Sequence, residues 1–303
     1  MKALVTGGAG FIGSHLAQAL ADGGHEVHVL DNLSSGRAEW VPGQAVLHVL
    51  ELNSPELHEL VERIRPEVVF HLAAQADVQR SIADPAFDAQ VNITGTVSLL
   101  DACRKSAVRR FVFASTSGVY GDSVHEKLTE DIPAAPISYY GQSKLAAEGY
   151  IRIFHKLYGL PYTILRYGNV YGPRQTPKGE GGVVAVFLQQ LRRGQPITIH
   201  GDGGQTRDFV YVRDVVEANL AAAASTGCGL YHVSTGRSTT IRQLAELIRE
   251  TRSAPVPVLF GEARPGDIRH SCLDNRRIRE ELGWSPRYRI ADGLRETCAA
   301  FLP

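Results

Sequence analysis

Short apolar segments alternate with longer amphipathic ones, and this alternation constrains the fold more than any other feature of the sequence. The apolar segments predict strands over residues 2–6, 26–30, 45–50, 68–72, 110–114 and 162–166. The intervening segments predict helices over residues 12–22, 55–64, 87–105 and 138–158. Strands joined by helices of this length run parallel, because each helix carries the chain back across one face of the sheet. The sequence therefore predicts an α/β fold with helices on both faces of a parallel sheet.

The alternation fades after Arg166. Residues 172–182 and 201–207 predict loops, and residues 240–252 predict one clear helix. A chain of 303 residues has room for one large or two ordinary domains. We expect residues 1–168 to contain the sheet and residues 169–303 to form a smaller mixed α/β part, with interleaving of segments allowed. No linker-like run separates the two parts, so we expect them to pack tightly.

The charge balance and the cysteines argue against several kinds of partner. Lys plus Arg and Asp plus Glu each number 32, so the basic excess of proteins that bind nucleic acids or anionic membranes is missing. No segment approaches the roughly 18 apolar residues of a membrane span, and the N-terminus lacks the apolar stretch of a signal peptide. The four cysteines lie far apart and form no CxxC pair, which argues against zinc. We expect a cytoplasmic protein with no nucleic-acid, membrane or metal partner.

A glycine-rich loop, Gly7-Gly8-Ala9-Gly10-Phe11-Ile12-Gly13, follows the first predicted strand and opens the first predicted helix. Glycines here let the turn tighten, let a pyrophosphate approach the backbone and let helix and strand pack closely. Asp31 ends the second strand about 20 residues further on, where a carboxylate accepts hydrogen bonds from ribose hydroxyls and repels a 2′-phosphate. A purely structural glycine turn is the alternative. In this context the loop predicts a Rossmann-type doubly wound sheet that binds NAD rather than NADP.

Tyr140 and Lys144 lie near the start of the predicted helix 138–158, and their spacing places a phenol and an ammonium on one face. A phenol with a pKa near ~10 is a poor base at neutral pH, but a nearby ammonium favours the phenolate. The pair predicts an acid–base dyad, although such spacing is common by chance. Thr116 follows the fifth strand, at the edge where parallel sheets bind ligands, and is a candidate to bind a substrate oxygen beside Tyr140. A simple chain turn is the alternative for Thr116.

Together these motifs resemble the nucleotide-sugar branch of the extended short-chain dehydrogenase/reductase family, and within it the UDP-glucose 4-epimerases. The resemblance covers nearly the whole chain. Beyond the loop, the threonine and the dyad, it rests on these segments: Asp31-Asn32-Leu33, His71-Leu72-Ala73-Ala74, Asn92 with Thr94, 165–174, Arg207-Asp208-Phe209-Val210, Asp214-Val215 and Arg264-Pro265-Gly266-Asp267.

The resemblance implies roles for the matching residues. Tyr140 is expected to be the catalytic base, Lys144 to hold the nicotinamide ribose and lower the pKa of Tyr140, and Thr116 to bind the 4-oxygen of the sugar. The nucleotide diphosphate of a UDP-sugar is expected to contact Asn169, Arg207 and Arg264, since a guanidinium fork matches phosphate oxygens. The expected contacts with NAD are Gly7, Gly10, Phe11, Ile12, Gly13, Asp31, Asn32, Glu51, Leu52, Leu72, Ala73, Ala74, Asn92, Tyr140 and Lys144.

One of these positions departs from the family pattern. An aspartate usually follows the third strand and binds the adenine amino group, whereas this chain has Glu51-Leu52 there. The carboxylate is retained with one more methylene, so we expect adenine to be held with a slightly altered geometry.

The residues after Thr116 favour one reaction within the family. The reactions start with oxidation of the hexose at C4, and the dehydratases and decarboxylases place a carboxylate next to the threonine or before the following Val-Tyr. Ser117 and Gly118 occupy these positions here. The resemblance therefore implies a UDP-hexose 4-epimerase, which oxidises C4, rotates the keto sugar and returns the hydride. A UDP-glucuronate 4-epimerase, a UDP-glucuronate decarboxylase and a nucleotide-sensing protein without activity are the alternatives.

Ser271 matches a position that flanks the sugar pocket in 4-epimerases of this type. A tyrosine there narrows the pocket to plain hexoses, and a small residue admits an N-acetyl group. We expect UDP-N-acetylhexosamines to be accepted beside UDP-glucose and UDP-galactose, unless another side chain fills the space. Members of the family often dimerise through helices that match 87–105 and 138–158, so we expect a homodimer.

Overall fold

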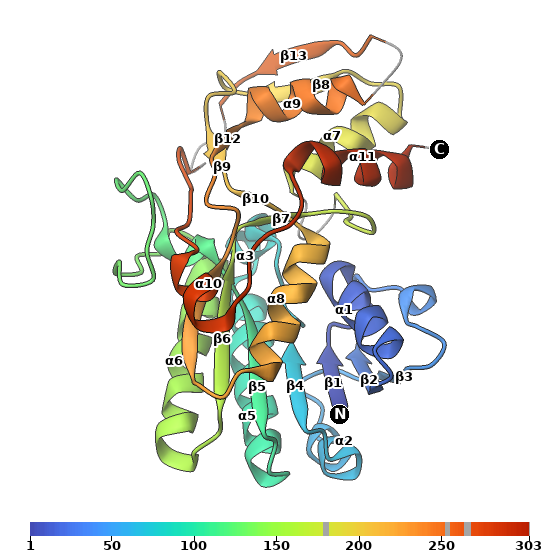
Figure 1. Ribbon diagram of the computed structural model, residues 1–303, viewed down its shortest axis with the longest axis vertical. Coiled ribbons are helices and arrows are strands. Elements are labelled where there is room, and N and C mark those ends of the chain that lie inside the picture. The colour runs from blue at the N-terminus through green and yellow to red at the C-terminus, as the bar shows by residue number, and fades with distance from the viewer. Residues whose placement is uncertain (178–181, 252–254, 264–267, 303) are drawn as a thin grey trace.

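The computed structural model describes residues 1–177, 182–251, 255–263 and 268–302. Over this part of the chain its centre is a seven-stranded parallel sheet with helices on both faces (Figure 1). The strands of this sheet are β1 (Lys2–Thr6), β2 (Glu26–Asp31), β3 (Val46–Val49), β4 (Val68–His71), β5 (Arg110–Thr116), β6 (Tyr162–Tyr167) and β11 (Gly229–Val233). They lie in the order β11-β6-β5-β4-β1-β2-β3. This confirms the predicted Rossmann-type fold.

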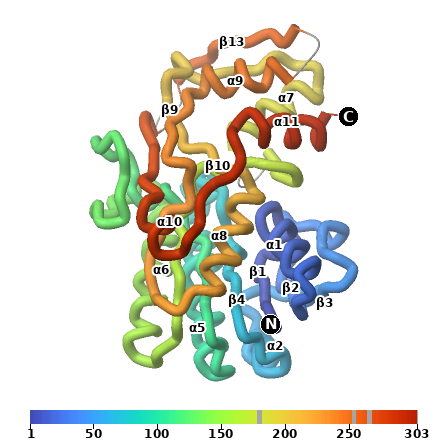
Figure 2. The backbone as a smooth tube through the Cα atoms, viewed as in Figure 1, coloured from blue at the N-terminus to red at the C-terminus, as the bar shows by residue number. Residues whose placement is uncertain are grey.

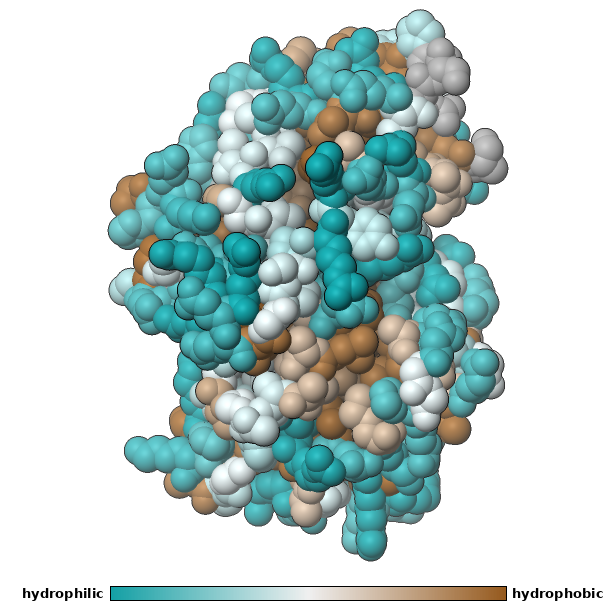
Figure 3. All heavy atoms as spheres, viewed as in Figure 1, coloured by the Kyte–Doolittle hydropathy of each residue, from teal (hydrophilic) through white to brown (hydrophobic). Residues whose placement is uncertain are grey.

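Alternate residues of each strand point to opposite faces of the sheet and enter two separate apolar cores. Val5 packs in the core that α1 and α8 cover, and its neighbour Leu4 packs in the core that α2, α5 and α6 cover. The helices of the first face are α1 (Phe11–Asp22), α8 (Val212–Ala224) and α10 (Arg276–Leu282). Those of the second face are α2 (Leu57–Ile64), α5 (Gly95–Lys105) and α6 (Tyr139–Tyr158). In the space-filling view, polar side chains cover most of the visible face and apolar ones gather where α1 and α8 meet (Figure 3).

All six predicted strands are confirmed, with ends that differ by at most two residues. The seventh strand, β11, was not predicted, because residues 229–233 are neither strictly alternating nor flanked by a recognised helix. It pairs in parallel with β6, so a segment from the second half of the chain completes the sheet of the first half. The intervening helix α8 was not predicted either, since its alanine-rich sequence has a weak apolar face.

The helix predicted over residues 87–105 is interrupted. It begins as α4 (Pro85–Ala89), passes through a π-helical segment, η2 (Gln90–Thr94), and continues as α5. A short helix, α3 (Val78–Ala83), precedes it, and single 3-10 turns lie at η1 (Ala38–Trp40) and η3 (Ser117–Tyr120). π-helical segments within an α-helix, such as η2, often mark functional sites.

The remaining elements form a second layer beyond the carboxyl ends of the sheet strands, in the yellow to red part of the tube (Figure 2). Three pairs of short strands stand here: β7 (Asn169–Tyr171) with β10 (Phe209–Tyr211), β9 (Thr206–Arg207) with β12 (Thr239–Thr240), and β8 (Ile197–His200) with β13 (Val258–Gly261). The helices α7 (Val183–Arg192), α9 (Ile241–Glu250), which confirms the helix predicted over 240–252, and α11 (Ile290–Phe301) pack with them around a third apolar core. None of the helices in the described residues is long and apolar enough to cross a membrane.

Candidate active site

A cleft of about 2360 Å³ lies between the carboxyl ends of the sheet strands and the second layer. Open parallel sheets bind ligands at this edge, where the strand order reverses on either side of β1. The cleft brings together every predicted site residue except Asn92 and Arg264. Arg264 lies outside the described residues. Asn92 is buried behind the wall of the cleft, where it hydrogen-bonds the backbone of Gln75 and the hydroxyl of Ser143.

The glycine loop lies at the floor of the cleft and fits a pyrophosphate. A Cβ on Gly7 would stand 2.7 Å from the nitrogen of Ala73, and a Cβ on Gly13 would stand 2.1 Å from the carbonyl oxygen of Gly7. Side chains are therefore excluded, and the backbone comes within reach of a ligand. Gly10 precedes α1 and no side chain caps the helix there, so its first N–H groups are available to bind an anion.

Asp31 lies beside the loop at the end of β2. Its Oδ2 accepts a hydrogen bond from the nitrogen of Ala9 (3.0 Å) and its Oδ1 from the nitrogen of Leu33 (2.8 Å). Burial raises the pKa of this carboxyl, and the two N–H donors oppose the shift. A carboxylate has about four acceptor positions, so two donors leave capacity for ribose hydroxyls. Asn32, Glu51 and Leu52 line the same end of the cleft.

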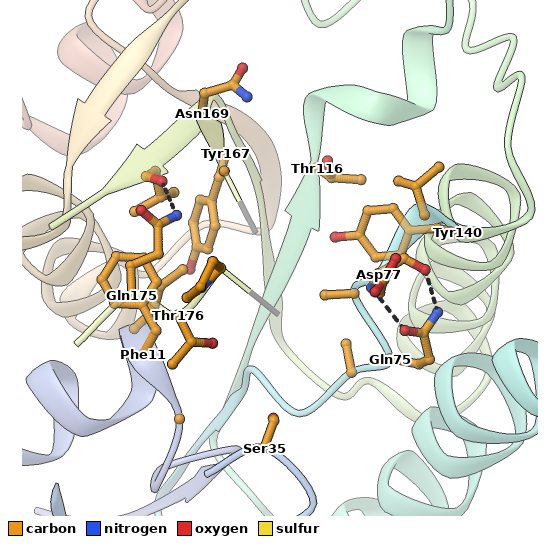
Figure 4. A pocket seen from close by; sticks show the side chains of 18 of the residues that line it. Phe11, Ser35, Gln75, Asp77, Thr116, Tyr140, Tyr167, Asn169, Gln175 and Thr176 are labelled. Atoms are coloured by element: carbon orange, nitrogen blue, oxygen red, sulfur yellow. Dashed lines mark hydrogen bonds between the residues drawn. The ribbon is translucent and has the colours of Figure 1, made fainter. Parts of the chain in front are cut away.

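Thr116 and Tyr140 stand on one wall of the cleft, and the Tyr140 hydroxyl points into it (Figure 4). Thr116 ends β5, where its Oγ1 accepts a hydrogen bond from the nitrogen of Gly118 (3.0 Å). Tyr140 lies in the first turn of α6, whose cap Ser138 accepts from the nitrogen of Gly141 (3.1 Å). A strand end and a capped helix therefore hold the two hydroxyls.

Lys144 is almost completely buried one turn below Tyr140. Its Nζ donates to the carbonyl oxygen of Ala114 (2.9 Å) and lies 4.7 Å from the centre of the Phe113 ring. Burial, assisted by the charge of Lys144, lowers the pKa of the neighbouring His71 to about 3. The imidazole is therefore neutral at physiological pH.

A buried ion pair connects this wall to the sheet. Glu148, one turn after Lys144 on α6, accepts from the Nε and Nη2 of Arg166 (2.8 and 2.7 Å) and from the hydroxyl of Ser115 (2.7 Å). Arg166 also donates to the hydroxyl of Tyr120 (2.7 Å). The pair fixes the helix of the dyad relative to the two strands that flank it.

The other wall carries the residues expected to bind the nucleotide diphosphate. Asn169, Arg207 and Ser271 line it, and Asn169 stands at the far end from the glycine loop (Figure 4). The backbone nitrogen of Asn169 donates to the carbonyl of Asp208 (2.7 Å), which joins β7 to β10. A guanidinium and an amide in this position can bind phosphate oxygens.

Several lining residues were not singled out from the sequence. They are Ser35, Gln75, Asp77, Tyr167, Arg174, Gln175 and Thr176, among others. Asp77 could have been found from the sequence as a candidate helix cap. It caps α3 by accepting hydrogen bonds from the nitrogens of Gln79 and Arg80. Tyr167 and Arg174 belong to the segment 165–174, which the resemblance covered without giving them a role.

A glycine loop with a carboxylate at the second strand, and a threonine, tyrosine and lysine on the opposite wall, define a dinucleotide-dependent enzyme of the Rossmann type. The model of the NAD dependent epimerase/dehydratase family matches residues 3–231. The chain belongs to this family and is an NAD-dependent isomerase.

Individual relatives match over the whole chain. A UDP-glucose 4-epimerase of Mycolicibacterium smegmatis is 44% identical, with 99% of this chain and 98% of the relative covered. The structure of a UDP-glucose 4-epimerase of Thermotoga maritima with UDP-glucose has a TM-score of 0.96 at 44% identity, covering 99% of this chain and 98% of that one. A UDP-N-acetylglucosamine 4-epimerase of Methanobrevibacter ruminantium in complex with UDP-N-acetylmuramic acid has a TM-score of 0.95 at 36% identity, with the same coverage.

We predict that Asp31→Asn weakens the binding of NAD about tenfold and reduces the preference for NAD over NADP, because the lost charge no longer repels a 2′-phosphate. Dissociation constants for both dinucleotides, measured by calorimetry, check this. Glu246→Gln removes an exposed carboxylate that pairs with Arg249, and neither residue lines the cleft, so it should change neither constant. If the ratio of the dissociation constants for NAD and NADP is unchanged in Asp31→Asn, the ribose does not bind at Asp31.

Proposed function

We propose that the protein is a 4-epimerase of a UDP-hexose, with UDP-glucose and UDP-galactose as substrates. The observation that carries this proposal is the wall on which Thr116, Tyr140 and Lys144 meet, with Ser117 and Gly118 rather than a carboxylate directly after Thr116. The names of the two 44% identical relatives support it. In this proposal residues 1–168 hold NAD and residues 169–303 bind the nucleotide sugar, with β11 and α8 returning to the first part.

In the proposed reaction, Tyr140 takes a proton from the sugar and later returns it. The Tyr140 phenolate accepts the proton of the sugar 4-hydroxyl, which Thr116 orients through its Oγ1. NAD, when bound, supplies the acceptor for the hydride of C4. Lys144 favours the phenolate through its positive charge and binds the nicotinamide ribose. After rotation of the keto sugar, C4 would take the hydride back on its opposite face while Tyr140 returns the proton to the 4-oxygen, so the reaction has no net redox change.

The positions of the carboxylates favour epimerisation over loss of water or CO2. Gly118 has no side chain, and a Cβ there would stand 3.3 Å from the Oγ1 of Thr116. The described residues that line the cleft include three carboxylates: Asp31, Glu51 and Asp77. Asp31 and Glu51 belong to the glycine-loop end, and Asp77 lies in a different segment from Thr116, where its Oδ1 caps α3. Elimination therefore has no free acid at the position that the dehydratases use.

Asp77 also favours an uncharged hexose over a hexuronate. Its backbone is fixed by Gln75, which accepts from the Asp77 nitrogen (2.8 Å) and donates to its carbonyl (2.9 Å), as the dashed lines show (Figure 4). Ser81, one turn further along α3, accepts from the nitrogen of Tyr140 (3.2 Å), so the Asp77 carboxylate belongs to the catalytic end of the cleft. A substrate carboxylate there would meet a like charge.

We predict that Tyr140→Phe lowers turnover of UDP-galactose by about a hundredfold or more, because it removes the general base. Chromatography of the UDP-sugars after incubation measures this, and the wild type should interconvert the 4-epimers without consuming added NAD. The neighbouring Tyr139 is exposed and outside the cleft, so Tyr139→Phe should retain full activity. A pentose product in the wild type, or near-normal turnover in Tyr140→Phe, would contradict the proposal.

We further propose that Ser271 leaves room for an N-acetyl group. Ser271 is buried and lines the cleft, and its side chain is among the smallest. The UDP-N-acetylglucosamine 4-epimerase among the structural relatives supports a substrate range that includes N-acetylhexosamines.

Ser271→Tyr is expected to lower the activity on UDP-N-acetylgalactosamine at least about tenfold relative to that on UDP-galactose, because the phenol ring occupies the volume of the acetyl group. The ratio of kcat/KM for the two substrates is the measurement. Ser271→Ala keeps the space open and serves as the matched control. An equal loss for both substrates in Ser271→Tyr would show that the residue does not select the sugar.

We also propose that the protein acts as a cytoplasmic homodimer. Its four cysteines are free thiols, which suits a reducing compartment. Tyr150, Ile153, Leu157 and Tyr158 project from one side of α6, and each has between 42% and 63% of its surface exposed. An apolar stripe of this kind is typical of a helix that packs against a second copy.

In sedimentation experiments we expect a dimer for the wild type and a dissociation constant at least about tenfold higher for Leu157→Glu, because a charge would be buried between the helices. Val124→Glu introduces the same charge at a position that is 97% exposed and outside α6, in the segment after η3, and it should leave the dimer intact. A monomeric wild type would refute the assignment.

A further inference from the structure

The segment that follows β7 crosses from the second layer to the first helix of the sheet. The carbonyl oxygen of Pro173 lies 2.9 Å from the Nε2 of His15, and the Nη1 of Arg174 donates to the Oγ of Ser14 (3.0 Å). Ser14 is fully buried in the first turns of α1, where its hydroxyl donates to the carbonyl of Phe11 (3.2 Å). The guanidinium of Arg174 is thus held at the end of α1 that faces the glycine loop.

Arg174 also lines the cleft, together with Gly10, Phe11 and Ile12 of the loop. Its neighbours Gln175 and Thr176 stand on the same wall as Phe11, opposite Tyr140 (Figure 4). The Nε2 of Gln175 donates to the carbonyl of Val170 (2.9 Å) and fixes the segment. The position of the guanidinium therefore follows from contacts on both sides of it.

The electrostatics at this point favour a negatively charged ligand. The N-terminus of a helix already carries a partial positive charge, so a cation beside it is unfavourable unless an anion lies between them. No carboxylate of the described residues forms an ion pair with Arg174. Burial lowers the pKa of its guanidinium, and the charge of Arg174 contributes to the lowered pKa of His15. The guanidinium of Arg174 remains charged, although no carboxylate of the described residues pairs with it.

The backbone of Arg174 adds to this picture. Its φ is +67°, in the left-handed region that glycine adopts without strain. An arginine here costs conformational energy, which is consistent with a function for its side chain.

We infer that Arg174 binds the pyrophosphate of NAD from the side opposite the glycine loop. One N–H of the guanidinium is used by Ser14, and the remaining donors are enough for a bidentate contact with phosphate oxygens. The inference rests on the NAD dependence of the family and not on the identity of the sugar. It means that the second half of the chain contributes to holding a cofactor that the first half cradles.

The test compares binding of NAD to the wild type, Arg174→Gln and Arg174→Lys. Calorimetry gives the dissociation constants, and the NAD retained per chain after gel filtration gives a second readout that needs no turnover. We expect Arg174→Gln to bind NAD at least about tenfold more weakly and Arg174→Lys to lie between it and the wild type, since a lysine keeps the charge but loses the fork.

Arg213→Gln is the matched control. Arg213 also contributes to the lowered pKa of His15, but it pairs with Glu296 (3.1 Å) and does not line the cleft, so its loss should leave the affinity for NAD unchanged. Ser14→Ala keeps Arg174 and removes its anchor, and it should weaken NAD binding by a smaller factor. If Arg174→Gln does not fold, Ser14→Ala and Arg174→Lys decide the question in its place.

Binding of UDP separates the cofactor from the substrate. The dissociation constant of UDP should be the same in the wild type and in Arg174→Gln. An unchanged affinity for NAD in Arg174→Gln, or a loss confined to UDP, would overturn the inference.

Discussion

The contact between α1 and the glycine loop is the constraint on which the site depends. A Cβ at Gly13 would stand 2.1 Å from the carbonyl oxygen of Gly7, so only the absence of a side chain lets the helix begin so close to β1. This closeness aims the first N–H groups of α1 into the cleft and sets Ser14 where Arg174 reaches it. One packing contact thereby fixes both the dipole that binds an anion and the cation that faces it.

The opposite wall depends on a different interaction, the buried pair of Glu148 and Arg166. Each partner would be costly to bury alone, and two hydrogen bonds between them, with Ser115 and Tyr120 as further partners, satisfy both charges. The pair joins α6 to the ends of β5 and β6. Small displacements between a base and its substrate reduce rates strongly, so a rigid connection between the Tyr140 helix and the Thr116 strand is functionally important.

Local patterns were sufficient to predict the six strands of the first half, the glycine loop, Asp31 and the Tyr140–Lys144 pair. Elements that depend on distant partners were not found. Residues 229–233 become β11 only because the edge of β6 accepts them, and α8 is buried against α1 rather than strongly amphipathic by itself. The sequence around Arg174 does not indicate where its side chain lies, because that position depends on a hydrogen bond with Ser14, 160 residues earlier in the chain. Asn92 was expected at the cofactor, and its place in a π-helical segment behind the wall could not be inferred from spacing.

The distribution of charge along the cleft suits the proposed reaction, in which one site holds two polyanions and acts on a neutral sugar. We propose that cations and helix N–H groups bind the phosphates, with Arg174 and α1 serving NAD and Arg207 serving the UDP-sugar. Between them the reacting wall presents hydroxyls, and its lysine is almost completely buried beneath them. His71 is kept neutral by burial, so it adds no charge to this wall. In the proposed reaction the keto sugar turns about its link to the diphosphate, and the hydroxyls of Thr116 and Tyr140 can contact the 4-oxygen in either orientation.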